Sequence, residues 1–68
     1  MTKTKNYRID LLEGLWTLRE TDTGKVIYRH KAREKAEKKA YAITRRKGGT
    51  VEVFGPLGHL LASVSFGD

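Results

Sequence analysis

A basic segment between residues 31 and 47 holds the side chains best suited to chemistry, because lysine and arginine heads attract phosphates and carboxylates. An α-helix turns by about 100° per residue, so the spacing of most of these heads confines them to an arc of roughly 120° that contains no acidic residue. The cations in this arc are Lys31, Lys35, Lys38, Lys39, Arg45 and Arg46. A surface that serves only solubility usually mixes both signs of charge. The one-signed arc therefore predicts a site for an anionic partner.

The same periodicity predicts how a helix over 31–47 is held. A stripe of small and apolar residues lies beside the basic arc and is typical of a helix packed on a core. Its members are Ala32, Ala36, Ala40 and Ile43. Gly48 and Gly49 can end the helix, since glycine accepts the left-handed backbone of a C-terminal cap. The start is weakly specified, because no Ser, Thr, Asp or Asn stands just before Lys31 and His30 is a poor cap.

Alternation of apolar and polar residues predicts strands on both sides of this helix. The expected strands cover residues 7–11, 15–20 and 25–29 before it and 51–54 and 59–66 after it. Glycine-containing turns separate them at 13–14, 21–24 and 55–58. The order β-β-β-α-β-β predicts an α+β fold, an antiparallel sheet with one helix packed on one face. Residues 7–68 form a single domain after a flexible N-terminus, residues 1–6, and Trp16 is expected to anchor the core under the helix.

The chain is short and strongly basic. Its 68 residues allow one domain of marginal stability, so a homodimer, paired through the last strand, would add buried surface. The net charge of +6 favours nucleic acid or an acidic protein surface as partner. There is no cysteine, and no apolar run is long enough to span a bilayer. These features predict a cytoplasmic protein with no membrane partner.

Patterns typical of catalysis and metal binding are missing from the sequence. His30 and His59 are the only histidines, and no HxxxH or DxDxDG spacing is present, so the usual zinc and calcium sites are excluded. Ser63 and Ser65 do not lie in a Gly-x-Ser-x-Gly elbow, and the glycines match no nucleotide-binding loop. We therefore expect no enzyme activity, no catalytic residue, no metal and no cofactor.

A tryptophan strand, an alanine-bearing helix and a glycine-containing hairpin follow one another at distinctive spacing over residues 15–68. The residues that carry this pattern are Gly14, Leu15, Trp16, Leu18, Arg19, Ala36, Ala40, Gly48, Gly49, Val51, Glu52, Val53, Gly58, His59, Leu60, Gly67 and Asp68. In this pattern the chain resembles DUF2188, a domain of unknown function found in small bacterial and phage proteins. It departs from that family at His30 and Lys31, where Thr or Ser is common, and at Pro56 and Leu57, where the turn is usually more polar. The resemblance implies a small α+β fold and no established activity.

Two functions of different classes agree with these observations. The first is a small nucleic-acid-binding protein that contacts duplex DNA through its phosphates with low sequence specificity. In that hypothesis Arg19, Lys25 and Arg29 extend the basic arc across the strands. The alternative is a phage-type or regulatory interaction module that docks on an acidic partner surface. A third possibility is a basic domain whose charge serves solubility only.

Overall fold

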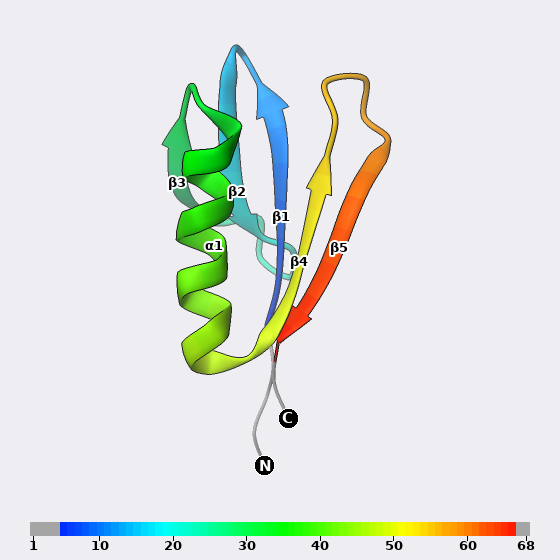
Figure 1. Cartoon of the computed structure of the whole chain (residues 1–68). Coiled ribbons are helices and arrows are strands. Elements are labelled where there is room, and N and C mark those ends of the chain that lie inside the picture. The colour runs from blue at the N-terminus through cyan, green and yellow to red at the C-terminus, as the bar shows by residue number, and fades with distance from the viewer. Residues whose placement is uncertain (1–4, 67–68) are drawn as a thin grey trace.

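The computed structural model describes residues 5–66, in which five strands form one sheet with one helix on one of its faces (Figure 1). The elements are β1 (Lys5–Leu12), β2 (Leu15–Glu20), β3 (Val26–His30), α1 (Arg33–Lys47), β4 (Gly49–Phe54) and β5 (Leu60–Phe66). In space the strands follow the order β3-β2-β1-β4-β5. The predicted α+β class and the order β-β-β-α-β-β are confirmed.

The sheet is mixed, so the prediction of a purely antiparallel sheet was wrong. β1 and β4 are parallel neighbours, with Tyr7 opposite Val51 and Ile9 opposite Val53, whereas the other three strand pairs are antiparallel. The helical connection explains this direction. The chain leaves β3, returns along the sheet through α1 and enters β4 in the direction of β3. β3 itself runs parallel to β1, because β2 lies between them and is antiparallel to both.

The backbone conformation in the β1–β2 turn and at the end of α1 agrees with the sequence-based prediction for both segments. In the turn between β1 and β2, Glu13 has φ 51° and Gly14 has φ 81°, as expected for a two-residue hairpin with two left-handed residues. At the end of α1, Gly48 has φ 80° and its N–H donates to the carbonyl of Thr44 at 2.7 Å. The start of β1 lies at Lys5, inside the segment 1–6 that the sequence predicts to be flexible. Residues 1–4, and the Gly67 and Asp68 of the family pattern, lie outside the described residues.

α1 begins at Arg33, two residues later than predicted. Lys31 and Ala32 precede it, and Ala32 has extended backbone at φ −102° and ψ 124°. The N–H of Ala32 donates to Nδ1 of His30 at 2.9 Å, so the imidazole satisfies one amide at a helix start that has no side-chain cap. The weak start that the sequence predicts thus shortens the helix, and it leaves Lys31 outside it.

The core lies between α1 and the face of the sheet that we call the helix side. Its buried residues come from β1, β2, β4 and the helix, and are Tyr7, Ile9, Leu18, Val51, Val53, Ala36 and Ala40. The third buried position of α1 is Thr44, whereas Ile43 is half-buried, so the buried stripe is turned away from the predicted Ala32 and Ile43. Thr44 can be buried because its hydroxyl donates to the carbonyl of Ala40 at 3.0 Å.

Gly49 lies at the start of β4, opposite Lys5 of β1. Its φ is +129°, and a Cβ atom at this position would overlap the backbone carbonyl of Lys5. We expect Gly49→Ala to lower the free energy of unfolding by about 2 kcal/mol or more, because a backbone carbonyl cannot move aside as a flexible side chain can. Gly14→Ala is the control, since its φ is +81° but no atom lies near an added Cβ. It should lose only about 1 kcal/mol. Equal losses in urea denaturation would contradict the close approach.

Candidate nucleic-acid interface

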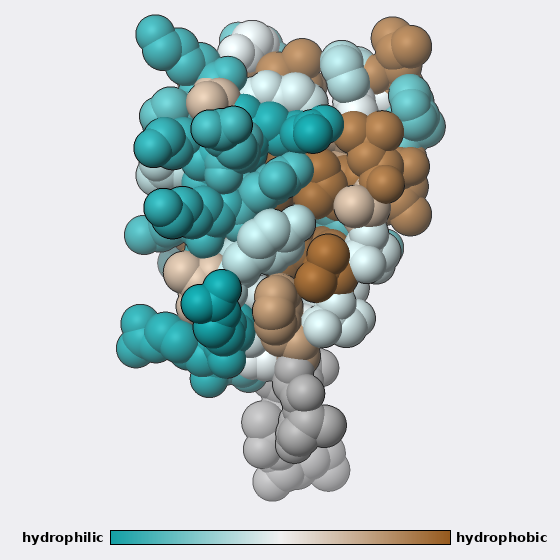
Figure 2. All heavy atoms as spheres, in the orientation of Figure 1, coloured by the Kyte–Doolittle hydropathy of each residue, from teal (hydrophilic) through white to brown (hydrophobic). Residues whose placement is uncertain are grey.

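Five predicted cations lie outside the buried stripe of α1, and two of them, Lys39 and Arg46, lie on the flank toward β3. Ala36, Ala40 and Thr44 are buried on the inner side of the helix, and all five cations are exposed. These five, here called the α1 basic face, are Lys35, Lys38, Lys39, Arg45 and Arg46. At 1.5 Å of rise per residue the face extends about 16 Å along the helix axis. Figure 2 shows the resulting hydrophilic surface over the helix, in teal.

None of the five cations of the α1 basic face forms an ion pair with an acidic side chain among residues 5–66. The ion pair on the helix joins Nε of Arg33 to Oε2 of Glu37 at 3.2 Å. Glu34 is spaced favourably for a pair with Lys38, but the structure does not bring the two together. The positive charge of this face is therefore not neutralised from within the described part of the chain.

On the flank of α1 that faces β2 and β3, two cations of the helix lie close to aromatic rings of these strands. The Nζ of Lys39 lies 5.8 Å from the ring centre of Tyr28, and the guanidinium of Arg33 lies 5.9 Å from that of Trp16. Trp16 is half-buried and packs against the core, as the sequence predicts. Lys35, Lys38 and Arg45 make no such contact in the described structure, so their heads are the ones best placed to reach a partner.

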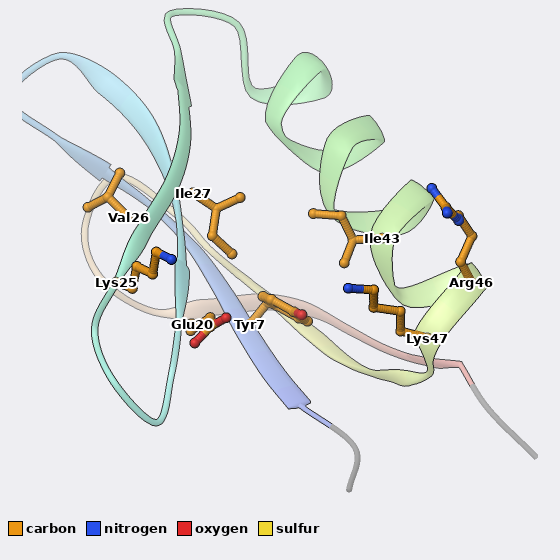
Figure 3. Close-up of a pocket in the computed structure, with 8 residues that line it drawn as sticks. All are labelled: Tyr7, Glu20, Lys25, Val26, Ile27, Ile43, Arg46 and Lys47. Carbon is orange, nitrogen blue, oxygen red and sulfur yellow. The ribbon is translucent and has the colours of Figure 1, made fainter. Parts of the chain in front are cut away.

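A pocket of about 520 Å³ lies between the C-terminal end of α1 and the start of β3 (Figure 3). It is lined by the apolar or aromatic Tyr7, Val26, Ile27 and Ile43 and by the charged Glu20, Lys25, Arg46 and Lys47. Figure 3 shows Lys25 and Glu20 on the strand side and Arg46 and Lys47 on the helix side. The predicted site residue Lys25 thus lies across this pocket from Arg46, rather than in line with the α1 basic face.

Glu20 weakens the positive charge at Lys25. The carboxylate of Glu20 accepts a hydrogen bond from the hydroxyl of Thr23 at 3.0 Å and pairs with Nζ of Lys5 at 3.4 Å. The Thr23 hydrogen bond, and after it Lys5, hold the pKa of Glu20 below its ordinary value. The carboxylate is therefore ionised at neutral pH and attracts the ammonium group of Lys25. The pocket rim, which includes Arg46 of the α1 basic face, therefore carries mixed charge.

Arg19 and Arg29 lie on the sheet face opposite to the helix, so the hypothesis that they extend the basic arc was wrong. Side chains alternate between faces along a strand, and paired residues of neighbouring strands share a face. Arg19 follows Leu18, which is buried under α1, and Arg29 follows Tyr28, which pairs with Leu18. Both arginines therefore face the open side of the sheet, where Arg29 is exposed.

An ion-pair network on the open face fixes Arg19. Oδ2 of Asp10 lies 2.9 Å from Nη2 of Arg19 and 3.6 Å from Nη2 of Arg8. The guanidinium of Arg8 in turn lies 4.4 Å from the ring centre of Phe54. Our sequence reasoning missed this network, although the two-residue spacing of Arg8 and Asp10 places both on one strand face and could have indicated it. Arg19 is therefore already engaged in an ion pair on the open face.

Comparison of the chain with protein-family models, curated proteins and solved structures finds no significant match. The resemblance to DUF2188 therefore stays a prediction. Within residues 5–66 the helix is neither long nor apolar enough to cross a membrane. In the same residues no three histidine or acidic side chains are grouped in a way that could hold a metal ion.

Proposed function

We propose that the protein binds duplex DNA through the α1 basic face, by phosphate contacts with little base specificity. The observation that carries this proposal is the set of five exposed cations on one side of one helix, none paired with an acidic side chain of residues 5–66. Lysine and arginine heads that contact phosphates release the counterions condensed on DNA, which favours binding. Such contacts position a protein on the duplex but do not read its sequence.

The length of the α1 basic face suits a groove of the duplex. Lys35 and Arg45 lie about 15 Å apart along the helix axis at 1.5 Å per residue. The major groove is about 12 Å wide between its two phosphate backbones. A helix laid across the groove brings Lys35 near one backbone and Arg45 and Arg46 near the other. Each arginine can donate to two phosphate oxygens, whereas a lysine acts as a point charge.

The positions of the cations along α1 argue against a purely structural role. Arg45 and Arg46 lie in the last turn, where the helix macrodipole favours cations, so they would stabilise the helix without any partner. Lys35 lies in the first turn, where the macrodipole disfavours a positive charge. The stability of the helix therefore does not explain Lys35, whereas binding of an anion by the outer face of α1 does.

Charge reversal on α1 tests the proposal. We expect Lys38→Glu and Arg45→Glu each to weaken binding of duplex DNA about tenfold, because each removes a phosphate contact and adds a repulsive charge. The loss should be alike for duplexes of unrelated sequence, since backbone contacts carry no sequence information. Fluorescence anisotropy with two labelled duplexes at about 0.1 M salt measures both effects.

Arg29→Glu is the matched control, because it makes the same change of charge on the opposite face of the sheet. At about 0.1 M salt the screening length is about 10 Å, so this variant should bind nearly as well as the wild type. Equal losses in all three variants, or no binding of duplex DNA at low salt, would contradict the proposal. Tighter binding of an acidic polypeptide than of DNA would instead favour docking on an acidic protein surface.

A further inference from the structure

β5 is an edge strand of the sheet that lacks charged residues. Its seven residues include no charged residue and no proline. Natural proteins usually blunt an exposed edge strand with charges, proline, irregular pairing or short length, because its free backbone groups can pair with another strand. The opposite edge, β3, is shorter, with five residues, and carries Arg29, whereas both edge strands pair with their neighbours through one register shift.

An apolar strip on β5 continues the core beyond the helix. In register, Val64 lies opposite Val51 and Ala62 opposite Val53, so these side chains share the helix side of the sheet. The strip, here called the β5 strip, consists of Ala62, Val64 and Phe66, whereas Leu60 pairs with Phe54 after a register shift and shares the open face with that residue. Five strands about 4.8 Å apart place the outer strand axes about 19 Å apart, which is wider than a helix of about 10–12 Å.

α1 therefore leaves part of the β5 strip uncovered. Phe66 is half-buried and contacts the ring of Tyr41 on α1, with ring centres 5.9 Å apart. Ala62, however, is exposed. Figure 2 shows the resulting apolar surface, in brown, beside the hydrophilic surface of the helix.

We propose that β5 pairs with β5 of a second copy of the chain, antiparallel about a two-fold axis at Ser63. In this register Ala62 of one copy lies opposite Val64 of the other, on both sides of the two-fold axis. Ala62 and Val64 at the centre of the contact thus meet apolar residues, and the two sheets join into one. The proposal is independent of DNA binding.

The distribution of charge favours a second copy over other partners. The chain has a net charge of +6, yet β5 carries none of it, so two copies can meet there without cations opposing one another. An acidic partner would find no cation on the β5 strip. A specific interface at the small end of the known range buries about 600 Å² per partner. That is about an eighth of the accessible surface of 4863 Å², and a small domain gains stability from such burial.

A single introduced thiol tests the register. The chain has no cysteine, so Ser63→Cys places the only thiol of each copy at the two-fold axis. Directly opposed residues of an antiparallel pair have Cβ atoms about 4.5–5.5 Å apart, close to the separation in a disulfide. We expect mild oxidation to convert most of this variant into a covalent dimer. Thr21→Cys, in the exposed turn after β2, is the matched control and should give several-fold less dimer.

Sedimentation of the uncrosslinked protein tests the interface itself. We expect the wild type to reach twice the monomer mass at micromolar concentration. Ala62→Glu should keep the monomer mass and the wild-type circular dichroism, because Ala62 is exposed in one chain but would bury an unpaired carboxylate in the dimer. A monomer mass for the wild type throughout the micromolar range, a dimeric Ala62→Glu, or equal crosslinking of the two cysteine variants would overturn the proposal.

Discussion

Raising the salt concentration from about 50 to about 200 mM is expected to weaken binding of duplex DNA by one copy of α1 about 500-fold. The α1 basic face has five cations, and each phosphate contact on B-DNA contributes about −0.9 to the slope of log affinity against log salt. Five contacts therefore give a slope near −4.5. An anisotropy titration repeated over a series of salt concentrations measures the slope directly.

Substitution of single cations tests whether the salt dependence of binding comes from the α1 basic face. Lys38→Glu should make the slope shallower by about 1, because one contact is lost, whereas Arg29→Glu on the opposite face should leave it unchanged. A wild-type slope shallower than about −2 would mean that only one or two cations meet phosphates. That result would contradict binding by the whole face, even if DNA still bound.

The two proposals have a joint geometric consequence. A two-fold axis perpendicular to the joined sheet leaves both copies of α1 on the same side of it. α1 packs over the middle of its own sheet. In the joined sheet the two β1 strands would lie five strand spacings apart, and the two β2 strands would lie seven spacings apart. These spacings correspond to about 24 and about 34 Å, and one turn of duplex DNA is about 34 Å long. A dimer would thus present two basic helices to one side of a duplex at a separation close to one helical turn.

Local patterns predicted the individual elements well. The strand expected over residues 15–20 has those bounds in the structure, and the turn at Glu13 and Gly14 has the expected positive φ values. The parallel pairing of β1 with β4 could not be predicted in the same way. It joins segments about 40 residues apart, and alternation within each strand is the same for either direction of pairing. The wrong expectation of a purely antiparallel sheet has this origin.

For the candidate site, too, the predictions that depend on neighbouring residues differ in outcome from those that depend on how distant segments pack. Helical periodicity predicted one arc of cations on α1, and the five of them that lie in the helix are exposed, because this periodicity depends only on neighbouring residues. The strand arginines were placed wrongly, since their side of the sheet depends on which neighbours the helix covers. The orientation of α1 also differs from the prediction. Thr44 replaces Ile43 in the buried stripe because an internal hydrogen bond lets a polar residue occupy a position where the pattern favours an apolar one.

Ala40→Glu is expected to abolish the folded state. Ala40 is completely buried between α1 and the sheet, so a glutamate there would place an unpaired charge and four additional heavy atoms in a packed core. Such changes cost about 4 kcal/mol or more, and a single domain of this size rarely has more than about 3–5 kcal/mol of stability. Circular dichroism should therefore show no cooperative thermal unfolding transition.

Ala42→Glu is the matched control, since it makes the same substitution on the same helix at an exposed position. Its stability should change by no more than about 0.5 kcal/mol, because the carboxylate stays in water. A comparable loss in both variants would mean that helix propensity, rather than burial of Ala40, sets the effect. A wild-type melting temperature for Ala40→Glu would show that the packed side of α1 is wrongly assigned. The α1 basic face would then also be wrongly placed, because it is defined as the side opposite to Ala36, Ala40 and Thr44.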